Sequence, residues 1–384
     1  MRAHNIRVVM RLVHEHSGIS RADIARKSGL SRSTVGDIVQ CLVGDGVLQE
    51  QHIHHSKNGR PPIALRIDEG RAFVVGVDLG VDRLNVIVMD LKGKVLASHM
   101  RHHDVEADPA GTIRKVERQI PFAVSTLGLD LKQLGGIGVA VRCPLDPQQP
   151  DQLSERILPA WKDVRLAARL HASFGVPVFV ENDANLGALA ECWWGHGRGL
   201  GDFALIRLAN GIGAGLVVGG EIYRGATGVA GEIGHTTIDP SGPMCRCGLR
   251  GCLEAMIGPH ILAGTEQVKA AEALMSSAQS GDADAIAVLD RTGSAIGIAV
   301  ANLVNLLNPQ AVVLSGALTQ AGDLLVAPIE NMLENRALWT AVDETRVVVS
   351  DLGAEAVALG AATMVLDTVI DNPSILPTRF SPRA

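Results

Sequence analysis

Four residues in one short segment have the chemistry and the spacing of a metal site. His235, Cys245, Cys247 and Cys252 fall within eighteen residues, in the pattern H-x9-C-x-C-x4-C. Three thiolates and one imidazole form a closed tetrahedral set, which is typical of structural Zn2+ and leaves no position for a catalytic water. The alternative is three buried cysteines that act as small hydrophobic residues. The segment is glycine-rich and polar, which favours the metal.

The other three cysteines are expected to have a packing role. Cys41, Cys143 and Cys192 lie singly in apolar runs. The sequence opens on no export signal, and we find no apolar run of the ~18 residues that a membrane span needs. Free thiols in a metal site indicate a reducing compartment. We therefore expect a cytoplasmic protein that has no membrane partner.

A second group of polar side chains follows an apolar run. Residues 176–180 predict a buried strand, and Glu181, Asn182, Asp183 and Asn185 stand where an alanine-rich helix begins. A carboxylate and amides at a strand end can bind the hydroxyls of a polyol or act as a base. The alternative is a helix N-cap, which needs only one of them. The sequence therefore favours a binding site.

Charge is distributed unevenly along the 384 residues. Hydrophobic residues make up 47% of the chain and charged residues 20%, as in a globular protein of two or three domains. The net charge is −6, yet residues 1–71 hold eleven Lys and Arg against seven Asp and Glu. A small basic head on an acidic body indicates that only the head meets a polyanion.

The head has the pattern of a helix-turn-helix. Residues 4–15 place apolar side chains on one helical face, Ser20 can cap a short second helix, and Ser31 can cap a third that ends at residues 44–46. The first turn of the third helix would enter the major groove of DNA. Its hydrogen-bonding side chains are Ser31, Arg32, Ser33 and Thr34.

Two β-prone arms then flank a basic turn, which predicts a wing. Lys57, Gly59 and Arg60 at its tip would contact the DNA backbone or the minor groove. The alternative for residues 1–70 is a protein-interaction module with a solvated charged turn. Caps, periodicity, wing and local charge all favour DNA binding, with affinity dominated by salt-sensitive phosphate contacts.

The body repeats one plan twice. FVVGVDLGVDRLNVIVMDLKGKVLASHM, from residue 73, reads as three strands with glycine turns, and FALIRLANGIGAGLVVGGEIYRG, from residue 203, follows the same plan. Two similar α/β halves predict a duplicated fold whose cleft binds a ligand.

Together these motifs resemble the ROK family of bacterial sugar kinases and sugar-responsive repressors. The resemblance rests on ENDAN at 181–185, NGIGAGLVVGG at 210–220, GEIGH at 231–235, CRCGLRGCLE at 245–254 and NLLNPQAVVLSGAL at 305–318. It implies a winged helix-turn-helix at 1–70 and a sugar-binding domain of two actin-like, hexokinase-type lobes at 71–371. It also implies a homodimer or dimer of dimers. The tail, 372–384, is predicted to be disordered.

The resemblance also implies roles for individual residues. Asn182 and Asp183 would hold sugar hydroxyls, and in kinases of the family the residue that matches Asp183 is the general base. Glu232, His235 and Glu254 would complete the sugar pocket. His235 would bind the metal through one ring nitrogen and face the sugar with the other, so the ion would orient a ligand-contacting imidazole.

Departures from the family pattern are expected to weaken phosphate binding. The kinases carry Asp-x-Gly-Gly-Thr in the first phosphate loop, where this chain has Val81 and Asp82. A carboxylate ~5 Å from a phosphate opposes binding by about 3 kcal/mol per charge pair at an effective dielectric of 20. The second loop, residues 210–213, lacks the usual threonine or serine. Arg142 and Cys143 replace a Pro-Gly pair near the sugar, which leaves the sugar's identity open.

These observations favour a transcriptional regulator, most simply a repressor, over an enzyme. Two heads of a dimer would read an inverted repeat in operator DNA, and a sugar or sugar derivative would alter their spacing. The first alternative is an ATP-dependent sugar kinase with a DNA-binding appendage, which Val81 and Asp82 oppose. The second is a sugar-binding scaffold that acts through a partner protein.

Overall fold

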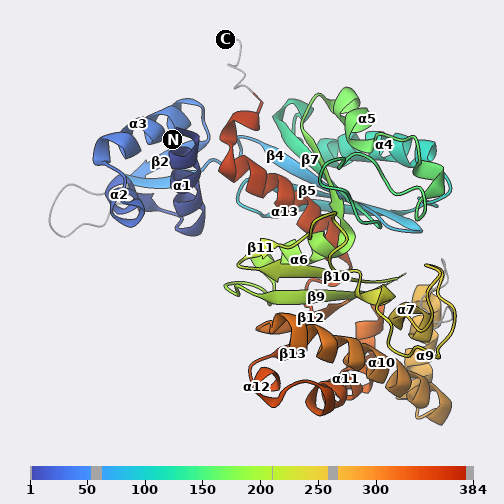
Figure 1. The fold of residues 1–384 in the computed structure, drawn as a ribbon. Helices are drawn as coiled ribbons and strands as arrows, with labels where there is room; N and C mark the ends of the chain where they lie inside the picture. The colour runs from blue at the N-terminus through green and yellow to red at the C-terminus, as the bar shows by residue number, and fades with distance from the viewer. Residues whose placement is uncertain (1, 53–62, 210, 258–266, 378–384) are drawn as a thin grey trace.

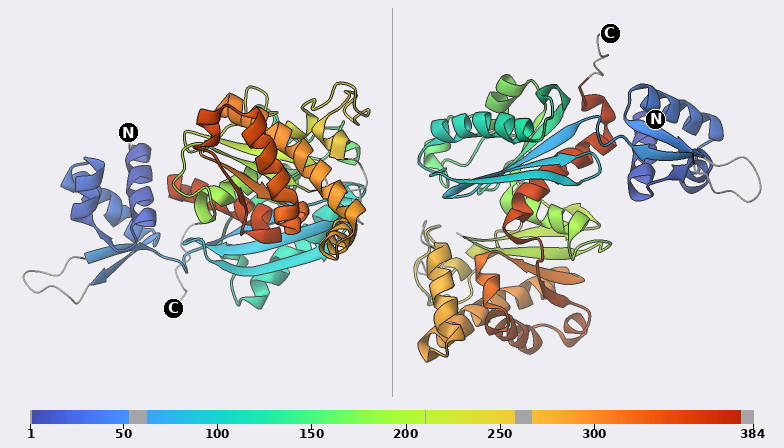
Figure 2. Two further views of the ribbon diagram at one scale, coloured as in Figure 1. Left: turned by 90° about the horizontal axis from the view of Figure 1, so that it is seen from below. Right: turned by 180° about the vertical axis from the view of Figure 1, so that it is seen from behind.

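The structure, a computed structural model, describes residues 2–52, 63–209, 211–257 and 267–377. They form an N-terminal head followed by two lobes, each built on a five-stranded sheet (Figure 1). Figure 1 and the right-hand view of Figure 2 place the head beside the first lobe and apart from the second. The predicted α/β fold with a helix-turn-helix head and two similar halves is confirmed.

The head contains three helices and a three-stranded sheet of order β1-β3-β2. Both predicted caps are present: Ser20 Oγ accepts from the backbone N–H of Asp23, and Ser31 Oγ from that of Thr34. Each cap satisfies a backbone donor that its helix leaves free. The elements are α1 (Arg2–Glu15), β1 (Ile19–Ser20), α2 (Arg21–Ser28), α3 (Arg32–Gly44), β2 (Leu48–His52) and β3 (Ile63–Ile67).

The first lobe has a mixed sheet of order β6-β5-β4-β7-β8. Alternate side chains of β4 pack on opposite faces of the sheet. Val75 and Val77 pack beneath α4 and α5, whereas Val74 packs beneath α13. The elements are β4 (Phe73–Leu79), β5 (Arg83–Asp90), β6 (Val95–His102), α4 (Pro109–Thr126), β7 (Leu134–Val141), α5 (Leu166–Phe174), β8 (Val178–Asn182) and the C-terminal α13 (Ala356–Asp371).

The second lobe repeats the plan with a sheet of order β11-β10-β9-β12-β13. One face of β9 packs under α10 and α11, and the other face packs under α6. The elements are α6 (Asp183–Trp194), β9 (Phe203–Leu208), β10 (Ile212–Val218), β11 (Glu221–Ile222), α7 (Leu253–Ile257), α9 (Gln267–Gln279), α10 (Ala283–Leu307), β12 (Ala311–Ser315), α11 (Asp323–Arg336), α12 (Trp339–Val342) and β13 (Arg346–Val349).

Helices α6 and α13 cross between the two sheets and approach each other closely. A Cβ added at Gly360 of α13 would lie 1.8 Å from the carbonyl oxygen of Leu186 in α6. Glycine is therefore required at this crossing. Figure 1 shows α13 running from this junction along the first sheet to the head.

Two helices depart from the expectation that no segment is long and apolar enough to cross a membrane. Helix α10 and the segment Gly353–Asp371 both meet that test by length and composition. In each, more than half of the apolar window is buried inside the protein, at 56% and 61%. Burial of this extent is typical of core helices, and both helices pack against the central sheets.

The C-terminal tail is ordered further than the sequence predicted. Residues 373–375 form a turn of 3-10 helix, and Leu376 is buried among apolar side chains of the first lobe. Burial of this leucine removes apolar surface from water, which stabilises the turn. The prediction of disorder over 372–384 is therefore wrong for 372–377, and residues 378–384 lie outside the described part.

Replacing Gly360 with alanine should destabilise the body. The new methyl group would meet the Leu186 carbonyl, and forcing such a contact apart costs about 1–3 kcal/mol. Urea unfolding followed by circular dichroism would measure the change. Gly201→Ala is the matched control, because its Cβ would meet no atom closer than 3.9 Å. Equal unfolding free energies for the two variants would contradict this packing argument.

Candidate functional site

The polar residues after β8 form the turn into α6. Asn182 caps this helix: its Oδ1 accepts from the backbone N–H groups of Ala184 and Asn185, and its Nδ2 donates to the Cys143 carbonyl. The capping alternative is therefore correct for Asn182. One oxygen of Glu181 accepts from the Asn182 N–H and the Asn185 amide. Its other oxygen binds Arg224 Nε at 2.6 Å.

Asp183 forms an ion pair that the sequence analysis missed. Arg207 Nη1 lies 2.8 Å from Asp183 Oδ2, and only about an eighth of each side chain is exposed. Arg207 comes from β9, so this pair ties the start of α6 to the sheet of the second lobe. The sequence did contain a sign of this pair. Arg207 is the one charged residue in the apolar run FALIRL, and a buried arginine needs a partner of opposite charge.

Asp78 lies near this pair, at the end of β4. Both of its carboxylate oxygens are buried and have no hydrogen-bond partner among the described residues. Burial raises the pKa of Asp78, and the charge of Asp183 adds to the effect. Val81 and Asp82 follow in the turn to β5, where their carbonyl oxygens accept from Val105 and His103.

Glu232 and Glu254 face the same region from the second lobe. Burial raises the pKa of Glu232, and repulsion from Asp183 and Glu254 adds to the effect. Glu254 is engaged on both oxygens: Oε1 lies 2.7 Å from Arg246 Nε, and Oε2 accepts from the Ile212 N–H. The Ile212 N–H, a backbone donor of the second glycine loop, is thus already bonded to Glu254.

Gly211 of this loop lies beside three charged side chains. A Cβ added there would be 3.1 Å from Glu254 Oε2, 3.4 Å from Arg246 Nη2 and 3.9 Å from Arg142 Nη2. Asn210 lies outside the described residues. The residues predicted to bind sugar, Asn182, Asp183, Glu232, His235 and Glu254, therefore come from both lobes and share one region with these arginines.

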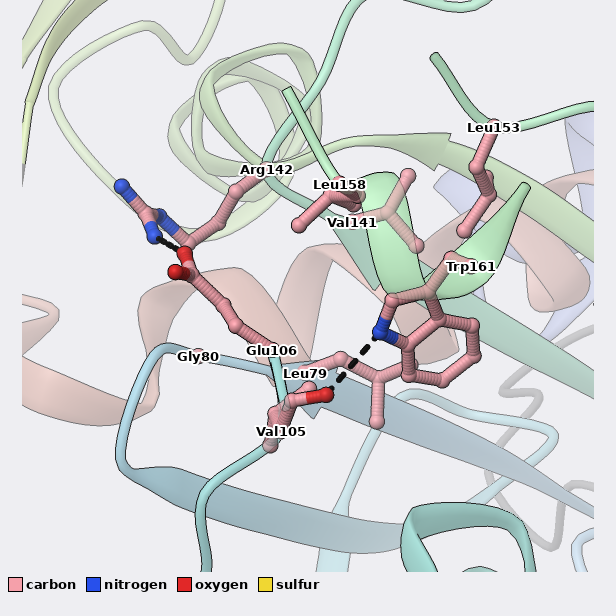
Figure 3. A pocket seen from close by; sticks show the side chains of 9 residues that line it. All are labelled: Leu79, Gly80, Val105, Glu106, Val141, Arg142, Leu153, Leu158 and Trp161. Carbon is pink, nitrogen blue, oxygen red and sulfur yellow. Dashed lines mark hydrogen bonds and ion pairs between the residues drawn. The ribbon is translucent and has the colours of Figure 1, made fainter. Parts of the chain in front are cut away.

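A small apolar cavity of about 10 Å3 lies next to Arg142. Figure 3 shows Arg142 turned to Glu106 at its edge, and Trp161 donating from Nε1 to the Val105 carbonyl. Leu153 lines this cavity and also a larger polar cavity of about 590 Å3. The larger cavity lies between residues 144–165 of the first lobe and residues 227–229 of the second. It is open enough for a small molecule.

The predicted metal ligands come together in the folded chain. One ligand atom from each of His235, Cys245, Cys247 and Cys252 lies within 4.8 Å of the others. His235 Nδ1 is 3.6 Å from Cys245 Sγ, and Nε2 points the other way, 4.0 Å from Glu232 Oε2. The cluster can hold a metal ion. One ring nitrogen faces the thiols and the other faces Glu232.

The loop around the cluster depends on one glycine. Gly251 has φ of 65°, and a Cβ there would lie 1.5 Å from the Asp239 carbonyl oxygen. Of the other cysteines, Cys143 is buried, which raises its pKa to about 11. Cys192 is partly buried, and burial raises its pKa to about 12. Cys41 is exposed, so the packing role expected for it is wrong.

The predicted DNA-contacting residues of α3 lie on the surface of the head. Ser31, Arg32 and Ser33 are exposed and Thr34 is half-buried. Ser31 Oγ lies 2.8 Å from both Ser33 Oγ and Thr34 Oγ1. The cap therefore also orders these hydroxyls. Lys57, Gly59 and Arg60, assigned to the wing tip, lie outside the described residues.

Comparisons with known proteins divide the chain in the same way. Residues 74–368 match the model of the ROK family, and residues 3–49 match a model described as winged helix-turn-helix DNA-binding. The xylose repressor of Bacillus subtilis is 29% identical over 371 residues, which cover 96% of each chain. The glucokinase of Thermotoga maritima is 31% identical over 315 residues, covering 77% of this chain and 98% of the kinase.

A solved structure supports the same arrangement. The ROK family transcriptional regulator described as a homolog of the E. coli MLC protein superimposes with a TM-score of 0.81 at 25% identity. The match covers 97% of this chain and 98% of that one, so it includes the head as well as both lobes. The chain belongs to the ROK family and carries the winged helix-turn-helix of its regulators at the N-terminal end.

Proposed function

We propose that this protein is a transcriptional repressor of carbohydrate-metabolism genes, controlled by a sugar or sugar derivative bound between its lobes. One observation carries the proposal. An exposed recognition turn and a group of polar side chains that meets between the lobes occur in one chain whose phosphate-binding features are altered. The full-length likeness to a xylose repressor and to a ROK transcriptional regulator supports it. A cytoplasmic location, where operator DNA is accessible, follows from this role.

The head would bind operator DNA through the first turn of α3. Arg32 is suited to a bidentate contact with a guanine edge, and the hydroxyls of Ser31, Ser33 and Thr34 suit phosphates. The wing residues Lys57, Gly59 and Arg60 would lie along the backbone. One recognition helix reads few bases, so a homodimer or a dimer of dimers would place two heads about 34 Å apart on an inverted repeat.

The sugar would be held by side chains from both lobes. Asp183 and Glu254 are acceptors already oriented by Arg207 and Arg246, and His235 Nε2 and Glu232 face the same region. A ligand that bridges residues of both lobes favours one lobe angle over others. The sugar can control DNA affinity if it binds one of two such lobe arrangements more tightly than the other by only a few kcal/mol.

A residual kinase activity is the second candidate, and the glucokinase likeness is the observation that favours it. Three features oppose it. Asp183 would be the base, but Arg207 neutralises it at 2.8 Å. The Ile212 N–H of the second glycine loop, a possible phosphate donor, is bound to Glu254. Val81 and Asp82 replace the small and hydroxyl residues of the first loop, and phosphoryl transfer depends on positioning and charge neutralisation at the phosphates.

The metal would be a structural Zn2+. A tetrahedral zinc with Zn–S of ~2.3 Å separates its sulfur ligands by about 3.8 Å. Cys247 Sγ and Cys252 Sγ are 3.6 Å apart, so the residues fit the ion. Zinc would supply no chemistry beyond ligation. The role of the chain's own residues is to hold the His235 ring so that Nε2 is directed at the sugar.

Arg32→Ala should weaken operator binding by 10- to 100-fold, because a bidentate base contact contributes about 1–3 kcal/mol. Fluorescence anisotropy with a duplex selected by the wild-type protein from a random pool would measure it. Arg101→Ala removes the same charge from an exposed site in the body and should leave the affinity unchanged. If the Arg32 variant binds as tightly as the control, the placement of the recognition turn is wrong.

Purified protein should contain one zinc per chain, and Cys247→Ser should lose most of it because three ligands hold the ion less tightly. Metal content would be measured by mass spectrometry. With the ring of His235 no longer held, sugar affinity should fall 10- to 100-fold. Cys41→Ser, which changes a thiol outside the cluster, should keep both the zinc and the affinity. A zinc-free wild-type protein with full sugar affinity would refute the structural role.

Calorimetric titration with Mg·ATP should give no heat of binding, either alone or with a mixed pool of sugars and sugar derivatives. The physical reason is that carboxylates occupy both phosphate loops. A ROK glucokinase under the same conditions is the positive control. Clear heat that the sugar pool increases would mean that Asp82 and Glu254 are tolerated, and kinase activity would become the leading function.

A further inference from the structure

The head contacts the body through one face of α1. Arg7 and Arg11, one turn apart, point at α13. Arg7 lies 2.8 Å from Asp371, and Arg11 lies 2.7 Å from Asp371 and 2.6 Å from Asp367. Asp367 and Asp371 are themselves one turn apart, so the positive side chains of α1 face the negative side chains of α13 along the contact. Figures 1 and 2 show α1 as the helix of the head nearest to α13.

A ring contact extends the same face to α6. His14, one turn beyond Arg11, lies with its ring centre 5.1 Å from that of Trp193, at an interplanar angle of 60°. Beneath the polar contacts, Val13 of α1 belongs to the same apolar cluster as Val369 of α13. The head is therefore held against the body by side-chain packing as well as by the linker.

Helix α6 connects this contact to the candidate sugar site. Its first residue is Asp183, its cap is Asn182, and its last turn contains Trp193 and Trp194. Twelve helical residues span about 18 Å, so one rigid element reaches from the predicted sugar hydroxyls to the head.

Helices α6 and α13 are also joined to each other. Gly360 meets the Leu186 carbonyl in the first turn of α6, and Trp194 Nε1 donates to Thr363 Oγ1 at its end, at 2.8 Å. A backbone contact this close leaves no room for one helix to slide without the other, because packed cores rearrange in discrete steps. A shift of Asp183 therefore displaces both surfaces on which α1 rests.

We propose that Arg7, Arg11 and His14 of α1, with Asp367, Asp371 and Trp193, form a latch that transmits sugar binding to the DNA-binding head. This inference rests on the proposed function. In the sugar-free protein the latch is closed and orients the head for DNA. Sugar bound at the start of α6 moves the far ends of α6 and α13, the latch opens, and the head loses the orientation that its operator requires.

The test is the variant Arg11→Gln, which removes the cation shared by both aspartates. Sugar affinity is measured by calorimetry, using D-glucose, D-xylose, N-acetylglucosamine and its 6-phosphate as probes. Operator affinity is measured with and without the probe that binds. In the wild-type protein the sugar should weaken DNA binding at least tenfold. In the variant the change should be less than twofold, while the sugar dissociation constant stays within threefold.

Two comparisons make the result specific to the latch. Arg2→Gln removes the same charge from an exposed position of α1 and should keep the tenfold response, whereas Arg11→Lys retains the cation and should restore part of it. Trp193→Leu removes the ring contact and serves as the second variant if Arg11→Gln does not fold. A full sugar response in Arg11→Gln or Trp193→Leu would overturn the proposal.

Hydrogen–deuterium exchange separates failure of the latch from failure of the function. Sugar should speed amide exchange in α1 of the wild-type protein without any DNA present. A sugar that weakens DNA binding but leaves exchange in α1 unchanged would overturn the latch and keep the repressor. If no probe altered DNA binding in the wild-type protein, the proposed sugar control would be overturned, and the latch that rests on it as well.

Discussion

The close crossing of α6 and α13 is the contact on which the rest of the structure depends. Helix α13 packs on the sheet of the first lobe and α6 on that of the second, so their crossing sets how the lobes meet. Gly360 allows the Leu186 carbonyl to occupy the space of a side chain. Because neither helix can repack alone, the crossing determines the surface that the body offers to the head.

Around this crossing, carboxylates of the inter-lobe region are neutralised by arginines of the same chain. The ion pairs are Asp183 with Arg207, Glu181 with Arg224, and Glu254 with Arg246. A kinase needs an available base and unoccupied phosphate donors, whereas a receptor needs only a ligand that binds one arrangement of the lobes better than another. The same fold supports either role, and these side chains favour the receptor.

The most accurate sequence predictions concern features that depend on near neighbours. The caps Ser20 and Ser31 were predictable because a cap bonds to a backbone group three residues away. The Cys and His cluster was predictable because its ligands fall within eighteen residues of one glycine-rich loop, so no packing between distant elements is needed to bring them together. The two-fold repeat of strand, glycine turn and strand likewise predicted two similar sheets.

The helix-turn-helix head, the paired α/β lobes, the metal-ligand set and the polar turn at the start of α6 were all predictable from sequence. The pairing of Asp183 with Arg207, and of Arg11 with Asp371, 360 positions away, became visible only in the folded chain. The physical reason is the separation in sequence between the interacting residues. Caps, periodicity and loop ligands depend on neighbours in the chain, whereas ion pairs between distant residues depend on how completed elements pack.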